Sequence, residues 1–210
     1  MTRKVLTGWI RDFQDAMGKT WDKDKIASLL LAGFAPGYDN DEDEDEDGAI
    51  VPSIDVLITF DRHGVSSHSN HISLYHGARE FVKQLAELDP DGDESTGLVS
   101  APVALYTLTT VGLLRKYSGI LDVFATLAER GRSSMRAKQT KKDVDDDGDE
   151  DAKQSPPDSL VFALPLGGAR SAVSARAPML RAHVSQMVWF RYGWIYLSRY
   201  MFINSLKLES

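Results

Sequence analysis

The order of two neighbouring segments constrains the fold most: a β-branched apolar run is followed shortly by an amphipathic helical pattern. The run SIDVLITF (53–60) has strand length and little alternation, which is typical of a strand buried on both faces of a parallel sheet. In the segment 71–88, apolar residues recur at helical spacing, namely Ala78, Phe81, Val82, Leu85 and Leu88. A strand that leads into a helix predicts an α/β domain with right-handed crossover connections.

The same alternation continues along the chain. Residues 103–110 (VALYTLTT) and 159–165 (SLVFALP) predict a second and a third strand. Helical patterns cover three further segments, 21–34, 111–131 and 169–191. Asp22 is placed to cap the first of these helices, and Pro178 to kink or break the last. Three strands are few for such a sheet.

Two acidic runs interrupt this pattern. Eight acidic residues lie in 39–47 and seven in 143–151, so the net charge of −7 becomes +8 when these runs are set aside. Like charges repel and bury nothing, so we expect disordered insertions at 37–51 and 132–158 of a single domain that spans 1–210. The alternative is an acidic segment that recruits a basic partner. The basic remainder suits an anionic substrate or an acidic membrane surface.

Several classes of protein are excluded by what the chain lacks. It has no cysteine, which removes disulfide frameworks and thiolate zinc sites and leaves histidines and carboxylates as metal ligands. No stretch reaches the roughly 18 to 20 apolar residues of a membrane-spanning helix, and no signal-peptide region precedes the first helix. Aromatic residues and arginines crowd 187–206. That composition occurs at membrane interfaces and, more often, where a helix packs on a sheet, which is the interpretation we favour.

Four of the five histidines lie in FDRHGVSSHSNHISLYH (60–76). The loop 61–70 leaves the carboxyl end of the first predicted strand, where open α/β sheets bind ligands. His68 and His71 are three residues apart and converge if a helix begins near Asn70. A catalytic zinc site usually needs three protein ligands, so the spacing alone leaves two alternatives open: a metal or catalytic site, and loop hydrogen bonds.

The segment ITFDRHGVSSHSNHISLY (58–75) resembles the signature of the N-acetylglucosaminyl-phosphatidylinositol de-N-acetylase family, the PIG-L or LmbE-like deacetylases. RDFQD (11–15), LLRKYSGILD (113–122) and the segment 185–206 match in the same order. The resemblance implies a Rossmann-like, LmbE-type α/β fold with a mostly parallel sheet. It further implies a zinc-dependent amide hydrolase that removes acetate from N-acetylglucosaminyl-phosphatidylinositol in the synthesis of glycosylphosphatidylinositol anchors.

The family's residue roles carry over by matching positions. His71 would be a zinc ligand, and His68 would stabilise the oxyanion or handle its proton. Asp61 would orient a histidine as a neighbouring carboxylate. Arg11 and Asp12 would contact the sugar or the phosphate of the substrate. His63 and His76 are not required by the signature, and we interpret both as incidental.

The resemblance also implies a location and partners. The enzyme would act on the cytoplasmic face of the endoplasmic reticulum membrane, with the glycolipid and a membrane surface as partners and no nucleic acid.

The chain departs from the family at one motif. The remaining zinc ligands and the general base come from an HPDDE motif after the first strand, preceded by a membrane helix, and neither occurs here. We therefore expect the first strands of the sheet and two of the three zinc ligands to be missing, and this chain to be inactive alone. The alternative function is a truncated, non-catalytic relative that binds the glycolipid or a partner subunit.

Overall fold

The computed structural model of the protein describes eight parts of the chain. They are residues 13, 18–35, 52–88, 103–142, 156–164, 169–182, 184 and 187–209, with the side chains of 88, 134–142 and 169–175 left out. Both acidic runs lie outside them, as do Arg11, Asp12 and His183. The chain divides into two compact units, one of Met1–Thr110 with Leu206–Ser210 and one of Val111–Ser205.

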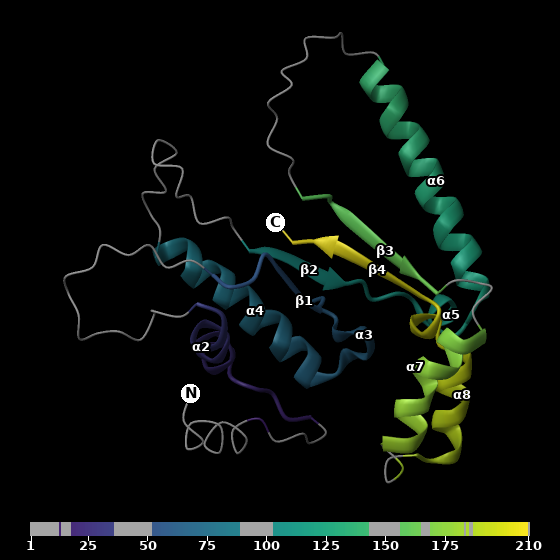
Figure 1. Ribbon diagram of the computed structural model, residues 1–210, viewed down its shortest axis with the longest axis horizontal. Coiled ribbons are helices and arrows are strands. Elements are labelled where there is room, and N and C mark those ends of the chain that lie inside the picture. The colour runs from purple at the N-terminus through teal and green to yellow at the C-terminus, as the bar shows by residue number, and fades with distance from the viewer. Residues whose placement is uncertain are drawn as a thin grey trace, which may run out of the picture. The chain divides into compact units, whose positions relative to one another are not determined.

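Four strands are hydrogen bonded in the order β1-β2-β4-β3 (Figure 1). They are β1 (Val56–Phe60), β2 (Ala104–Leu108), β3 (Ser159–Ala163) and β4 (Ile203–Leu208). β1 and β2 are parallel, with Val56 opposite Ala104, whereas β2 and β4 are antiparallel, with Tyr106 opposite Leu208. The α/β class is confirmed, but the mostly parallel sheet is wrong, because the described sheet is mixed.

The antiparallel strand β4 is the element that the sequence analysis missed. Ile203 and Leu206 are both buried although they are three residues apart, so the strand lacks the clean two-residue alternation that marks a half-buried strand. It also follows directly on an aromatic helical pattern. The predicted helical pattern ends at residue 191, and the sequence analysis assigned no element to residues 203–208.

The helices are α2 (Lys23–Phe34), α3 (Gly64–Ser67), α4 (Ser69–Leu88), α5 (Leu113–Lys116), α6 (Leu121–Lys142), α7 (Ala169–Ala182) and α8 (Trp189–Leu197), with a 3-10 turn, η2 (Arg199–Met201). As predicted, Asp22 caps α2, where its carboxylate accepts hydrogen bonds from two backbone amides of the first turn. Helix α7 continues past Pro178. None of the helices in the described residues is long and apolar enough to cross a membrane.

Helix α6 overlaps the start of the range 132–158, where we expected an insertion. Residues of high helix propensity, such as Ala128, Glu129 and Arg130, favour its continuation. The acidic run that follows lies outside the described residues. The expectation of a single domain with two acidic insertions stays a prediction.

In the first unit, α4 connects the parallel strands β1 and β2 and packs against α2, as Figure 1 shows. Ala27 and Leu31 of α2 and Phe81 of α4 are fully buried in the core between these helices. Gly77 marks the closest approach, because a Cβ atom there would overlap the Cβ of Ile26. The small residue lets the two helices meet.

Two predictions about burial fail. Val56 and Ile58 of β1 are 46% and 56% exposed, so β1 is not buried on both faces; it is the edge strand of the described sheet. The aromatic residues of α8 do not form a core either. Trp189 is 85% exposed and Trp194 is 50% exposed, so the favoured interpretation of core packing is wrong for α8, although Ile203 and Leu206 of the same segment 187–206 are buried.

A buried charge network holds the second unit together. Asp122 on α6 and Arg199 on η2 are 2% and 1% exposed, and Arg199 Nε lies 2.9 Å from Asp122 Oδ2 at an angle too poor for a hydrogen bond. Arg115 Nε donates to Asp122 Oδ1 at 2.8 Å, and Thr126 Oγ1 donates to Oδ2 at 2.9 Å. Burial alone would raise the pKa of Asp122, but these hydrogen bonds and Arg199 together hold it below its ordinary value.

We predict that Gly77→Ala destabilises the first unit. The added methyl group meets the backbone-proximal atoms of Ile26, which cannot swing aside, so the net loss is on the order of 1 to 2 kcal/mol of unfolding free energy. Gly33→Ala is the matched control, because its Cβ would meet open space and Ala favours the helix. Chemical denaturation of both variants checks this. Equal stability of the two would contradict the packing described.

We also predict an acid-side loss of stability from Asp122. Its pKa is lower in the folded chain than the ordinary 3.8, so it stabilises the fold above that value and ceases to do so as pH falls through the folded pKa. Asp122→Asn leaves the buried Arg199 without its counter-charge and Arg115 with the exposed Glu129 alone, and it should cost about 3 to 5 kcal/mol at pH 7 while flattening this acid-side slope. Denaturation between pH 7 and pH 2, with the exposed Asp158→Asn as control, measures both effects.

Candidate functional site

The histidine loop that follows β1 is held in a strained backbone conformation. Gly64, Val65 and Ser67 have positive φ angles of 62°, 62° and 57°. A positive φ is rare for a β-branched residue such as Val65 and persists only where the surroundings enforce it. Such strain is typical of functional loops.

The carboxylate of Asp61 holds the loop in this conformation through hydrogen bonds. Its Oδ1 accepts hydrogen bonds from the backbone N–H groups of His63 and Gly64, at 3.0 and 3.1 Å. Thr110, just after β2, donates to it twice at 2.6 Å, from its backbone N–H to Oδ2 and from its hydroxyl to Oδ1. The same hydroxyl accepts from Val65 N–H at 3.0 Å. In the described residues this carboxylate therefore binds the loop backbone and Thr110, and its expected role in orienting a histidine stays a prediction.

The ring of His71, in the first turn of α4, is fixed from two directions. Its Nδ1 lies 2.9 Å from the carbonyl oxygen of Gly64. A carbonyl only accepts, so Nδ1 carries the hydrogen, and the neutral ring keeps its lone pair on Nε2. The ring also stacks on Phe60, the last residue of β1, with centroids 3.8 Å apart and planes at 8°. A Cβ at position 64 would crowd His71 and Ile72, so glycine permits this approach.

His68 lies beside His71, as the spacing predicted. The two ring centroids are 5.2 Å apart, and His68 is exposed. The other two described histidines are engaged elsewhere: the ring of His63 receives a hydrogen bond from Arg62 at 3.2 Å, and His76 contacts the edge of Tyr75. The structure thus brings together the two histidines of the signature. Their chemical roles, like those of Arg11 and Asp12, stay predictions.

The described residues do not make a metal site by themselves. No group of three histidines, aspartates or glutamates among them is arranged to hold a metal ion. His68 and His71 supply two imidazoles at most, whereas a catalytic zinc ion usually has three protein ligands. The Nδ1 hydrogen bond of His71 is nevertheless the arrangement that prepares Nε2 to bind a metal.

A polar cavity of about 360 Å³ lies beside the loop in the same unit. Its lining combines cationic side chains with hydroxyl and carboxylate groups: Asp61, Arg62, His63, Tyr75, Thr107, Thr109, Lys207, Leu208 and Glu209. His68 and His71 are not among the lining residues. Cations and hydroxyls in one cavity suit an anionic, hydroxyl-rich molecule.

One wall of the cavity is a hydrogen-bonded pair from distant parts of the chain. The Tyr75 hydroxyl donates to Glu209 Oε1 at 2.6 Å. Burial and this hydrogen bond raise the pKa of Tyr75 above its ordinary value, so the hydroxyl stays protonated. The sequence analysis missed both residues and Thr110. Only the threonine pair at the end of the second predicted strand could have signalled one of them, since strand ends carry site residues in α/β folds.

Comparison with known proteins gives one consistent result. The chain is 38% identical to the N-acetylglucosaminyl-phosphatidylinositol de-N-acetylase of Arthroderma benhamiae over 94% of its own length and 58% of that protein's. It is 34% identical to the probable enzyme of that name from Schizosaccharomyces pombe, over 92% and 56%, and 30% identical to the Saccharomyces cerevisiae enzyme, over 98% and 60%.

The chain therefore spans less than two thirds of the length of these curated relatives. No family model and no solved structure matches it.

We predict that Thr110→Val loosens the histidine loop without unfolding the unit. The substitution keeps the size and shape of the side chain but removes the hydroxyl, and with it two hydrogen bonds, one from Val65 N–H and one to Asp61. The bond that Val65 loses is worth about 1 kcal/mol. Amide hydrogen exchange at Val65 should accelerate about fivefold. Thr59→Val, on β1 and outside this network, is the control. Unchanged exchange at Val65 would show that Thr110 does not hold the loop.

Proposed function

The chain belongs to the N-acetylglucosaminyl-phosphatidylinositol de-N-acetylase family, and on that premise we propose that it acts in removing the acetyl group from N-acetylglucosaminyl-phosphatidylinositol. The reaction hydrolyses an amide, releases acetate and leaves glucosaminyl-phosphatidylinositol, a step of glycosylphosphatidylinositol anchor synthesis. The observation that carries the proposal is the preset ring of His71, locked between Phe60 and the Gly64 carbonyl with His68 beside it.

In this proposal the two histidines have different tasks. His71 offers the Nε2 lone pair to a zinc ion, which supplies Lewis-acid chemistry when bound. His68 donates a hydrogen bond or a proton to the oxygen that gains negative charge as the amide carbonyl is attacked. The rigid loop keeps His71 in place during this change. The described residues alone do not fit zinc, so the remaining ligands must come from outside them.

The polar cavity supports a hydroxyl-rich, anionic substrate. Arg62 and Lys207 are cationic and can attract a phosphate, while Thr107 and Thr109 can hydrogen bond to sugar hydroxyls. Arg11 and Asp12 are proposed to add contacts to the sugar or the phosphate. The site as proposed is wider than the histidine loop, because the cavity opens beside it.

The fold type of the family and its location at a membrane are part of the same proposal. An LmbE-type, Rossmann-like fold would place a further strand beside β1, where Val56 and Ile58 are exposed. A lipid-linked substrate places the work at a membrane surface, and we propose the cytoplasmic face of the endoplasmic reticulum, with no role for nucleic acid.

A second candidate function is favoured by one observation. Because no three-ligand group exists among the described residues, the chain can also be a non-catalytic relative that binds the glycolipid or a partner subunit through its loop. Zinc analysis and deacetylation assays on the purified chain, beside a version extended upstream in frame, separate the two. Bound zinc and deacetylation by the extended version would support the catalytic function. Their absence from both versions would support the non-catalytic binding function.

We predict distinct outcomes for the two histidines in the active version. His71→Ala should lose zinc and turnover together, whereas His68→Ala should keep zinc and lose about 10²- to 10⁴-fold in turnover, the usual worth of a general acid or base. His76→Ala is the control, because its exposed ring contacts only Tyr75 among the described aromatic residues. Turnover retained by His71→Ala would remove that residue from the site.

A further inference from the structure

Helix α8 presents most of its large side chains to solvent. Its nine residues, WFRYGWIYL, include six with exposed apolar or aromatic side chains: Trp189, Phe190, Tyr192, Trp194, Tyr196 and Leu197. Val184 and Val188, just before the helix, are also exposed. Contiguous exposed apolar surface of this kind marks a place where something else binds.

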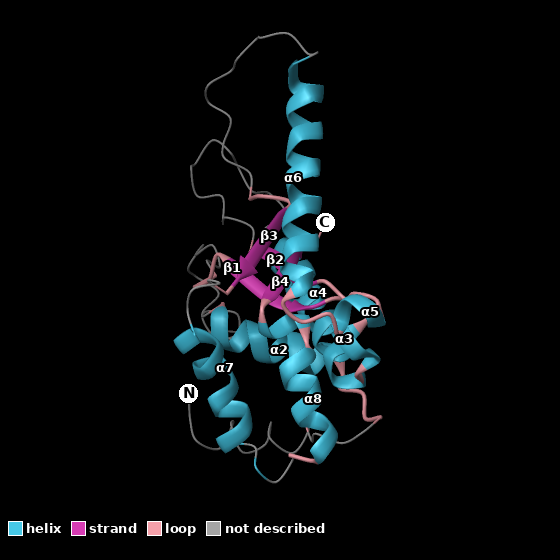
Figure 2. Cartoon of the chain, turned by 90° about the vertical axis from the view of Figure 1, so that its right-hand side faces the viewer, coloured by secondary structure: helices cyan, strands magenta, loops and turns pink. Residues whose placement is uncertain are grey.

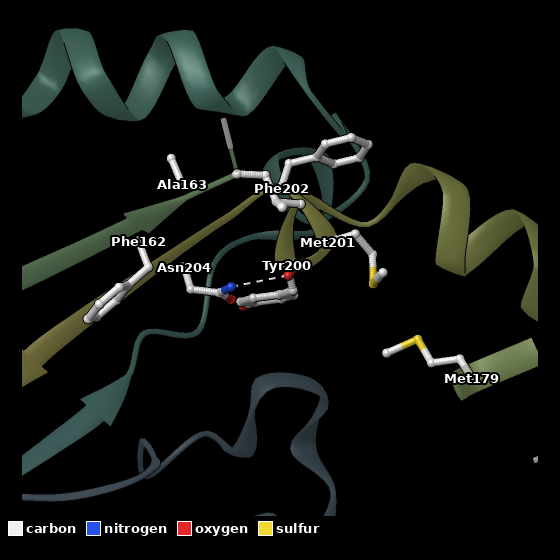
Figure 3. Close-up of a pocket in the computed structure, with 8 residues that line it drawn as sticks. Phe162, Ala163, Met179, Tyr200, Met201, Phe202 and Asn204 are labelled. Carbon is white, nitrogen blue, oxygen red and sulfur yellow. Dashed lines mark hydrogen bonds between the residues drawn. The ribbon is translucent and has the colours of Figure 1, made fainter. Parts of the chain in front are cut away.

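Arg176 of helix α7 reaches Tyr196 of α8, and α6 extends away from both helices in Figures 1 and 2. Beside them is an open, mostly apolar cavity of about 400 Å³, lined by Phe162, Ala163, Leu164, Met179, Tyr200, Met201, Phe202 and Asn204. Figure 3 shows Met179 and Met201 facing one another across it. Methionine side chains adapt their shape, so such a cavity suits a flexible hydrocarbon chain.

Arg176 of α7 adds a cation to this surface. Its guanidinium lies over the ring of Tyr196 at 4.7 Å and over that of Phe202, a lining residue of the cavity, at 5.4 Å. Its buried Nε has no hydrogen-bond partner in the described structure. The guanidinium carries its positive charge beside these rings, and that charge attracts an anion such as a phosphate.

The charged residues of the segment 159–208 also favour the binding of an anionic group. Residues 159–208 contain no aspartate or glutamate. Of the basic residues there, Arg199 is buried against Asp122 and Lys207 belongs to the first unit, so Arg176, Arg181 and Arg191 are the described cations of α7 and α8. Arg181 on α7 is exposed. An exposed apolar surface without a single acid complements the anionic face of a membrane.

We propose that α7 and α8 form a docking surface for a bilayer that contains anionic phospholipid. Tryptophan and tyrosine favour the interfacial layer, where rings are buried among acyl chains while their polar atoms stay hydrated. A nine-residue helix lies in this layer and does not cross it. Arg176 receives a headgroup phosphate, and the Met-lined cavity receives an acyl chain. The inference deepens the proposed function, which supplies a lipid-linked substrate, but its test does not require turnover.

Flotation of the purified chain with vesicles tests the surface directly. One set of vesicles is phosphatidylcholine alone and the other contains phosphatidylinositol as well. The chain should bind the anionic vesicles, its tryptophan fluorescence should shift to the blue, and lipids brominated on their acyl chains should quench it. Trp189→Ser with Trp194→Ser should weaken binding to both sets at least tenfold, through lost apolar burial.

Two further variants distinguish electrostatic binding to anionic lipid from non-specific hydrophobic adsorption. Arg176→Gln should lower binding to anionic vesicles about fivefold and leave binding to phosphatidylcholine unchanged. Phe124→Ser is the matched control, because Phe124 is an aromatic residue of the same unit, 58% exposed, but lies on α6. Circular dichroism confirms that each variant is folded. An equal loss in Phe124→Ser would mean non-specific adsorption and would overturn the proposal.

Other occupants give other results. If a second copy of the chain covers α8, sedimentation shows a dimer that the tryptophan variant dissociates, and vesicles do not bind. If further chain of a longer protein covers it, a version extended upstream loses the vesicle binding. Either result overturns the proposal. Vesicle binding without turnover on a detergent-dispersed substrate counts against the proposed function only, and turnover without vesicle binding counts against this inference only.

Discussion

The arrangement of the candidate site depends on one carboxylate. Asp61 directly follows β1, and its two oxygens accept hydrogen bonds from two loop amides and twice from Thr110, which lies beyond β2. Parallel strands present their carboxyl ends at the same edge, so one short side chain can connect both. The positive φ angles of the loop, the Gly64 carbonyl and the tautomer of His71 all follow from this connection. The site is therefore a property of two strands and not of the histidine loop alone.

In the second unit, too, one carboxylate connects separate elements, and here its partners include two positively charged side chains. Asp122 gathers two arginines and a threonine in the interior, which joins α6 to η2. A buried pair of this kind adds little net stability, since each charge loses its hydration, but it disfavours alternative packings that would leave a charge alone. Arg199, two residues beyond the end of α8, is held by this network, which fixes the point where the aromatic helix ends.

The sequence predicted those parts of the fold that depend on local pattern. The helix α2 with its Asp22 cap, the strand that leads into α4 and the convergence of His68 with His71 follow from spacing and turn chemistry within a few residues. The partners separated by long stretches of chain did not follow. Thr110 meets Asp61 across 49 residues, Glu209 meets Tyr75 across 134, and β4 pairs antiparallel with β2 without a clear alternation. The burial of α8 was misjudged, because aromatic composition is shared by cores and interfaces.

The open side of β1 has a consequence for how the chain is handled in a cell. An edge strand leaves a row of backbone donors and acceptors free to pair with any extended segment, and here Val56 and Ile58 add apolar side chains to that edge. In the sheet that the described residues form, this edge is therefore the surface most exposed to chaperones and to pairing between copies of the chain.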